Sequence, residues 1–171
     1  MAGIDNFTPK ARQVLSLAQK HAERFRKAQI STEHLLIALI ELEGSVASRV
    51  LRDLGLEVGR VVDLVENEIG FGDHVGQITL SPGMQQVIPH AIDEAKDSNK
   101  KAVSTEHLLL GLIHLSNCEA MNILKKLGVT PEQIRRQVQR VLKESQDETP
   151  PAMAGRPSSK RRRSEKKNQE K

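Results

Sequence analysis

The hexapeptide STEHLL occupies residues 31–36 and recurs unchanged at residues 104–109, an offset of 73 positions. When the chain is shifted by 73 with no gap, residues 7–70 align with residues 80–143 and give 20 identities in 64 pairs. Unrelated segments of this length would share only about three or four. The chain therefore contains a tandem duplication, and each copy is one structural unit.

Each copy reads as a series of four helices. Thr8-Pro9 and Ser81-Pro82 place a capping residue before a proline, which suits the first position of a helix. The apolar residues that follow recur at helical spacing, and the segment after STEH is apolar on most sides, which predicts a buried central helix. Gly55 and Gly128 close the third helix of each copy. Pro89 lies inside the first helix of the second copy, where we expect a kink or a later helix start.

These patterns predict an all-α fold, a pseudo-twofold bundle of about eight helices built from two tandem four-helix repeats. The first repeat spans 7–70, a Gly-rich linker spans 71–79, and the second repeat spans 80–143. The double-repeat domain is expected to cover 1–145. Residues 146–171 carry Pro, Ser and charge without a core-forming pattern, so a disordered basic tail is predicted there.

Composition excludes several function classes. Aromatic residues make up 2% of the 171 residues, with no Trp or Tyr, which argues against a base-stacking nucleic-acid platform. The formal net charge of +4 divides into +6 for residues 156–171 and −2 for the rest, so only the tail is basic. No apolar run approaches the ~20 residues that span a bilayer, and the N-terminus shows no secretory pattern. A cytoplasmic location without membrane association is expected.

No catalytic template is present. The sequence has no GxxxxGK[ST], GxSxG or HExxH motif. Cys118 is the single cysteine, and position 45 of the first copy holds Ser in its place, which favours a structural role. Adjacent residues on a helix point about 100° apart, so neither Glu33-His34 nor Glu106-His107 is suited to chelate one metal ion. The sequence predicts no enzymatic activity, no cofactor and no metal.

The STEH segments instead predict a polar recognition site. Ser and Thr cap a helix whose free N–H groups attract an anion, and the Glu of the first turn can pair with a guanidinium. The combination suits a ligand that carries both charges. The candidate binding residues are Ser31, Thr32, Glu33, Ser104, Thr105 and Glu106.

The two copies, each with an [FL]-[ST]-P start, an [ST]-T-E-H-L-L helix opening and an L-G-[LV] helix end, resemble the Clp N-terminal repeat domain. The resemblance covers residues 4–145 and is nearest to the N-domain of ClpC-type AAA+ unfoldases. It implies a pseudo-twofold helical bundle that docks adaptors and substrates for an ATP-driven unfoldase and its protease. It also implies phosphoarginine recognition, with Glu33 and Glu106 contacting the guanidinium and the helix starts contacting the phosphate. Family members often have Gly where this chain has Ser31 and Ser104.

No AAA+ module follows the repeats in this sequence, so we expect a stand-alone docking domain or a fragment of a larger unfoldase. Its expected partners are a Clp AAA+ unfoldase, adaptors and substrate proteins. The alternative is association with nucleic acid through the basic tail, which would be weak and salt-sensitive. The capped segment 127–142 also resembles a helix-turn-helix entry, but the matching stretch of the first copy is acidic.

Overall fold

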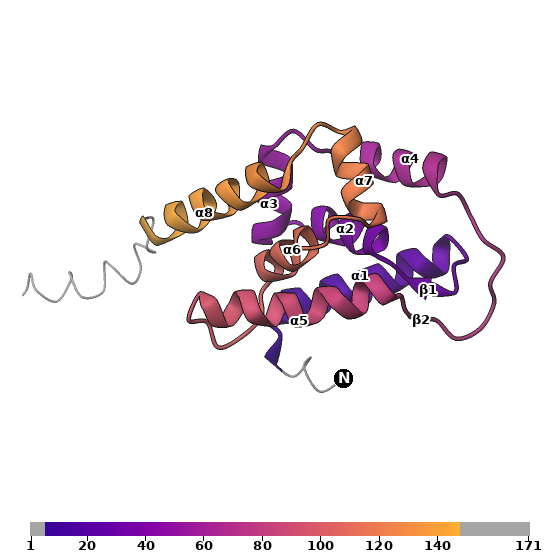
Figure 1. The fold of residues 1–171 in the computed structure, drawn as a ribbon, viewed down its shortest axis with the longest axis horizontal. Helices are drawn as coiled ribbons and strands as arrows, with labels where there is room; N and C mark the ends of the chain where they lie inside the picture. Colours follow the sequence, from indigo (N-terminus) through magenta and orange to yellow (C-terminus); the bar gives the residue numbers. More distant parts are fainter. Residues whose placement is uncertain (1–5, 148–171) are drawn as a thin grey trace, which may run out of the picture. The chain divides into compact units, whose positions relative to one another are not determined.

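The computed structural model describes residues 6–147, and these residues form an all-α fold with two very short strands (Figure 1). The elements, in chain order, are α1 (Pro9–Arg24), β1 (Gln29–Ile30), α2 (Thr32–Glu41), α3 (Val46–Asp53), α4 (Val58–Glu68), β2 (Thr79–Leu80), α5 (Pro82–Asp97), α6 (Thr105–Ile113), α7 (Glu119–Lys126) and α8 (Pro131–Asp147). One compact unit ends at Val138, within α8, and a second begins at Gln139. The prediction of eight helices is confirmed.

The helices begin where the sequence predicts. The Thr8 and Ser81 side chains cap α1 and α5 by accepting from the backbone N–H groups of Ala11 and Met84. Gly55, after α3, has a φ of +93°, the left-handed conformation that a residue with a side chain rarely adopts. The capping residues and the glycine therefore mark helix starts and ends at the expected positions.

The core of the first unit is built around α2 and α6. Every residue of α2 from Thr32 to Ile40 is buried, and so is every residue of α6 from Thr105 to Ile113. Neither helix has a solvent face, as the all-round apolar pattern predicts. α1 packs on α2, and α5 packs on α6.

The two repeats interlock rather than stand side by side as separate bundles. α2 of the first repeat contacts α7 of the second, and α3 of the first contacts α6 of the second. Ile30 pairs with Leu80 in the parallel β1–β2 ladder. Phe7 pairs with Val103 in an isolated parallel bridge, and these two residues are the equivalents of Leu80 and Ile30 at the 73-residue offset. The same cross-repeat pairing thus occurs twice, which is the expected consequence of pseudo-twofold symmetry.

Three details differ from the sequence-based expectations. The β1–β2 pair was not expected, because two residues per strand are too few to show alternation. α5 runs unbroken from Pro82, so Pro89 does not delay the helix start. α8 continues to Asp147, slightly past the predicted beginning of the tail at residue 146; the rest of that tail lies outside the described residues. Within residues 6–147 no helix is long and apolar enough to cross a bilayer.

Candidate functional site

Both STEH segments form helix starts stabilised by their own histidines. Ser31 is the N-cap of α2, and its backbone N–H donates to Nδ1 of His34 at 2.9 Å. In α6 the Ser104 N–H donates to Nδ1 of His107, also at 2.9 Å. Histidine here fills the place that Glu or Gln takes in a capping box. Burial lowers the pKa of His34 to about 4, which keeps the ring neutral.

The two threonines connect the repeats. Thr32 Oγ1 accepts from the backbone N–H of Ala120 in α7 at 3.2 Å, and Thr105 Oγ1 accepts from the N–H of Ala47 in α3 at 3.2 Å. A backbone N–H group in the first turn of α7 therefore finds its acceptor in the first repeat, and one in the first turn of α3 finds its acceptor in the second repeat. This cross-repeat capping joins two helix starts at each STEH segment, α2 with α7 and α6 with α3.

The two carboxylates are not freely exposed. Glu33 is 3% exposed and Glu106 is 5% exposed. Oε1 of Glu33 has no hydrogen-bond partner, and its Oε2 lies 3.8 Å from Nε2 of neutral His34. Burial, with a smaller contribution from the nearby charge of Glu119, raises the pKa of Glu33 to about 6. A carboxylate that is freely accessible to a guanidinium would be more exposed than either Glu33 or Glu106.

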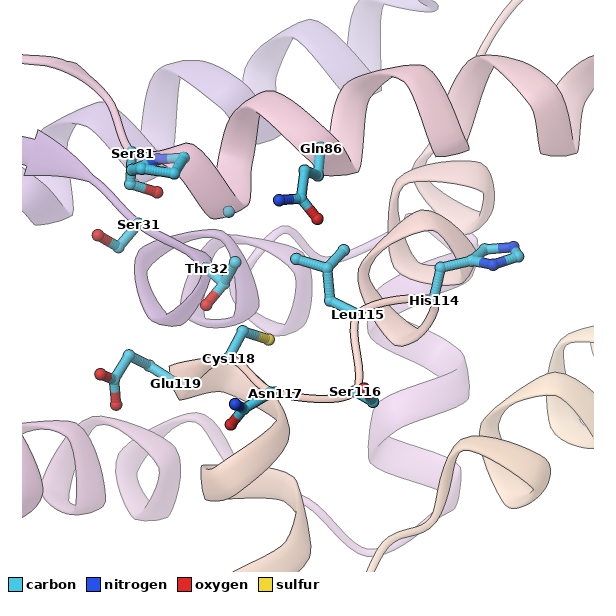
Figure 2. A pocket seen from close by; sticks show the side chains of 12 residues that line it. Ser31, Thr32, Ser81, Gln86, His114, Leu115, Ser116, Asn117, Cys118 and Glu119 are labelled. Carbon is cyan, nitrogen blue, oxygen red and sulfur yellow. The ribbon is translucent and has the colours of Figure 1, made fainter.

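A cavity of about 530 Å³, here called the α2 pocket, lies where α2, α5 and α7 begin (Figure 2). Figure 2 shows Ser81 and Gln86 of α5 above Thr32, with Cys118 and Glu119 at the start of α7 below it. The residues that line it are Ser31, Thr32, Ser81, Pro82, Gly83, Gln86, His114, Leu115, Ser116, Asn117, Cys118 and Glu119. Glu33 is not among them, so the pocket contains two of the three predicted residues of this repeat.

A second cavity of about 480 Å³, here called the α6 pocket, lies where α6, α1 and α3 begin. Its lining residues are Thr8, Pro9, Lys10, Gly44, Val46, Ser104, Thr105 and Glu106. All three predicted residues of the second repeat, Ser104, Thr105 and Glu106, are therefore brought together here. The Glu106 side chain reaches this pocket although most of its surface is covered.

Sequence reasoning missed most of the residues that line the two pockets, among them the charged residues Lys10 and Glu119. Aligning the two copies at the 73-residue offset reveals both residues, because Lys10 aligns with Gly83 and Glu119 aligns with Val46. Val46 lines the α6 pocket, whereas Ala47 and Val50 of the same helix are fully buried.

The described residues gather no group of three or more His, Cys, Asp or Glu side chains that could hold a metal ion. Cys118, the N-cap of α7, is partly exposed at the wall of the α2 pocket. The arrangement is that of two clefts at converging helix starts, each lined by both polar and apolar side chains.

Comparison with known proteins agrees with this fold. The family model for the Clp repeat (R) N-terminal domain matches residues 6–120 and 79–164. A probable ATP-dependent Clp protease ATP-binding subunit of Chlamydia pneumoniae is 34% identical over 152 residues, which cover 87% of this chain and 18% of that protein. ClpC/MecB of Bacillus subtilis, a negative regulator of genetic competence, is 37% identical over 150 residues, with coverages of 87% and 18%.

The N-domain of ClpV, solved in complex with a VipB peptide, superposes with a TM-score of 0.68 at 16% identity, covering 83% of this chain and 90% of that one. That similarity shows the fold. The chain spans less than a fifth of the length of the two Clp relatives above. The family model matches most of the chain, including both copies of the STEH motif, and on this evidence the chain belongs to the Clp repeat N-terminal domain family.

Proposed function

We propose that the chain is a non-catalytic docking module that receives substrates or adaptors of a Clp ATP-dependent unfoldase and protease. The observation that carries the proposal is the pair of pseudo-equivalent pockets. Each is formed where three helices begin, and each contains a threonine whose hydroxyl caps a helix of the other repeat. Concave sites that combine apolar surface with a few polar groups suit recognition of a side chain presented by another protein.

The relatives support a docking role. The ClpV N-domain of the same fold has been solved with a peptide bound, and the Bacillus subtilis relative is a Clp protein. No Walker A motif is present in the sequence, so the chain as given would depend on an ATPase elsewhere to unfold a protein. The proposed partners are therefore a Clp AAA+ unfoldase, its adaptors and its substrates, and the proposed location is cytoplasmic.

We further propose that the ligand group is phosphoarginine. Its phosphoryl group suits converging helix N-termini, and its guanidinium suits a carboxylate. The candidates are Ser31, Thr32 and Glu33 in the first repeat and Ser104, Thr105 and Glu106 in the second. The threonine hydroxyls already cap helices of the other repeat, so their role would be to hold the clefts in shape.

The test is capture of partners on the immobilised chain from lysate of the cell that makes it. Mass spectrometry should identify a Clp unfoldase subunit or one of its adaptors with the wild type, and less of it with the Glu33→Ala/Glu106→Ala variant. Glu43→Ala is the matched control, because the Glu43 side chain is 83% exposed and lines neither pocket. Recovery of no Clp component by the wild type would overturn the proposal.

The alternative, nucleic-acid association through residues 156–171, concerns a segment outside the described residues. The relatives reported above give it no support. A gel shift at increasing salt, with and without residues 156–171, separates the two functions. Binding of DNA that disappears with the tail, together with no Clp component captured, would favour the alternative.

A further inference from the structure

The linker between the repeats, residues 71–79, carries the two large apolar side chains that are exposed among residues 6–147. Phe71 is 57% exposed and Val75 is 86% exposed. Single exposed apolar residues are common on protein surfaces, but these two lie in one short connection between α4 and β2 (Figure 1). Neither lines the α2 pocket or the α6 pocket. The linker is therefore a surface feature that the two pockets do not use.

The start of the linker is held against the end of α1. The backbone N–H of Gly72 donates to the carbonyl oxygen of Phe25 at 2.8 Å, and that of His74 donates to the carbonyl oxygen of Arg26 at 3.0 Å. A Cβ built on Gly72 would collide with the Arg26 carbonyl oxygen, so this close approach requires glycine. These bonds satisfy carbonyl groups at a helix end and fix the segment that donates them. Phe71, which precedes Gly72, is therefore presented at a defined place.

Phe71 packs on the ring of Phe25 through only part of its surface. The two ring centroids lie 4.9 Å apart at an interplanar angle of 37°. Phe25 itself has no exposed surface, and the guanidinium carbon of Arg24 lies 5.7 Å from its centroid. The aromatic pair anchors Phe71 while more than half of this residue faces solvent. Burial of the remaining apolar surface by a partner would be favourable.

Basic side chains lie beside Phe71 at the end of α1. A Cβ built on Gly72, the residue after Phe71, would lie 3.5 Å from Cδ of Lys27. Arg26 is exposed and forms no ion pair within residues 6–147. Lys27 forms none in this part of the chain either, although its charge acts at longer range on the buried Glu33. The linker surface, as named here, consists of Arg26, Lys27, Phe71 and Val75.

The equivalent place in the second repeat differs in charge and in apolar character. Segment 20–27 has four Lys or Arg and one Glu, a net charge of +3, whereas the equivalent segment 93–100 has two Lys and three Asp or Glu, a net charge of −1. The aromatic pair of the first repeat corresponds to Ser98 and Glu144. The combination of an exposed aromatic ring with a basic helix end is thus particular to the first repeat.

We infer that the linker surface binds an acidic segment of another protein that presents a large apolar side chain. This side chain packs on the exposed part of Phe71, and the carboxylates of the segment pair with Arg26 and Lys27. Asp73, the single acidic residue of 71–79, opposes such a partner and limits its affinity. The surface shares no residue with the two pockets, so the inference does not depend on the proposed phosphoarginine recognition.

Fluorescence anisotropy of the full chain with a labelled peptide, DDEFEDD, tests the inference. Two comparison peptides, DDESEDD and KKRFRKK, remove the apolar side chain and reverse the charge. We expect saturable binding of DDEFEDD, and binding of both comparison peptides that is weaker by about tenfold or more. Equal binding of DDEFEDD and DDESEDD would show attraction by charge alone, which includes that of residues 156–171, and would overturn the inference. No binding of DDEFEDD would also overturn it, and would leave the function proposed for the pockets intact.

Four variants locate the binding. Phe71→Ser should weaken binding of DDEFEDD by about tenfold, because it removes the apolar contact. Lys27→Gln should weaken it by about threefold, the scale of one exposed ion pair. Lys100→Gln is the matched control, because Lys100 is the equivalent of Lys27 in the second repeat, and it should bind as the wild type does. Asp73→Asn should bind more tightly. Unchanged binding by Phe71→Ser, or equal losses with Lys27→Gln and Lys100→Gln, would contradict the assignment.

Discussion

At the scale of single residues, the ionisation of Glu33 opposes folding. This carboxyl group is buried, and its pKa is raised from 4.5 to about 6. The folded chain therefore binds the proton more tightly than the unfolded chain. The resulting stability is fully present below pH 4.5 and is lost as the pH rises through about 6. At neutral pH the charge costs about 2 kcal/mol.

We therefore predict that Glu33→Gln raises the free energy of unfolding by about 1 kcal/mol at pH 7.5 and by much less at pH 4.5. Urea denaturation at the two pH values measures the difference. Glu43→Gln, at an exposed side chain, should change neither value. Loss of stability at pH 7.5 on removing the charge would show that Glu33 has a favourable partner when ionised.

His34 has the opposite pH dependence. Its pKa is lowered from 6.5 to about 4, mainly by burial, so the unfolded chain binds a proton that the folded chain rejects. Stability is lost as the pH falls from 6.5 toward 4. Glutamine at this position can still accept from the Ser31 N–H but does not titrate.

When the pH is lowered from 7.5 to 5, we expect the free energy of unfolding of His34→Gln to fall by about 2 kcal/mol less than that of the wild type. Chemical denaturation of both proteins at the two pH values gives the comparison, in which the contribution of Glu33 is common to both. His34→Ala, which also removes the acceptor for Ser31, should be less stable than His34→Gln at pH 7.5. Equal pH dependence in wild type and His34→Gln would contradict the neutral-ring account.

At the scale of elements, the helix starts depend on side chains from the other repeat. Thr105→Val keeps the shape of the side chain but leaves the Ala47 N–H, at the start of α3, without its acceptor. The expected cost is about 1–2 kcal/mol. Thr105→Ser keeps the hydroxyl and should lose less. Equal stability of the Val and Ser variants in urea denaturation would show that this cross-repeat cap contributes nothing.

The contact between α5 and α6 requires glycine. A Cβ on Gly111 would lie 2.8 Å from the carbonyl oxygen of Val87 and from the backbone nitrogen of Ala91, and backbone cannot yield as a side chain does. Gly111→Ala should therefore lower the free energy of unfolding by about 1–3 kcal/mol. Gly59, on α4, has no atom within 4 Å of such a Cβ, so Gly59→Ala should leave stability unchanged or raise it. Thermal unfolding of both variants tests the contrast, and equal effects would contradict it.

The sequence predicts elements better than it predicts contacts between them. Thr8, Ser81, Gly55 and Gly128 mark helix ends through local backbone chemistry, which is legible in one sequence. The use of Thr32 and Thr105 to cap helices 88 and 58 residues away depends on the tertiary arrangement. The burial of Glu33 and Glu106 has the same origin, since a first-turn carboxylate is exposed on an isolated helix.

At the scale of the whole duplicated unit, the two copies keep the same contacts with exchanged residues. His21 of α1 pairs with Glu41 of α2 at 2.5 Å, and the equivalent positions of the second repeat pair Glu94 with His114 at 2.7 Å. The partners have been reversed while the contact between the two helices remains. The pockets show the same process with a different outcome, because Lys10 and Gly83 no longer carry equivalent chemistry.

The most direct measurement is a two-dimensional NMR titration of the ¹⁵N-labelled chain with the phosphoarginine peptide. The account predicts that backbone signals at the two helix starts, 31–33 and 104–106, shift on addition of the peptide. No shift at saturating peptide, or shifts confined to residues remote from both pockets, would contradict it.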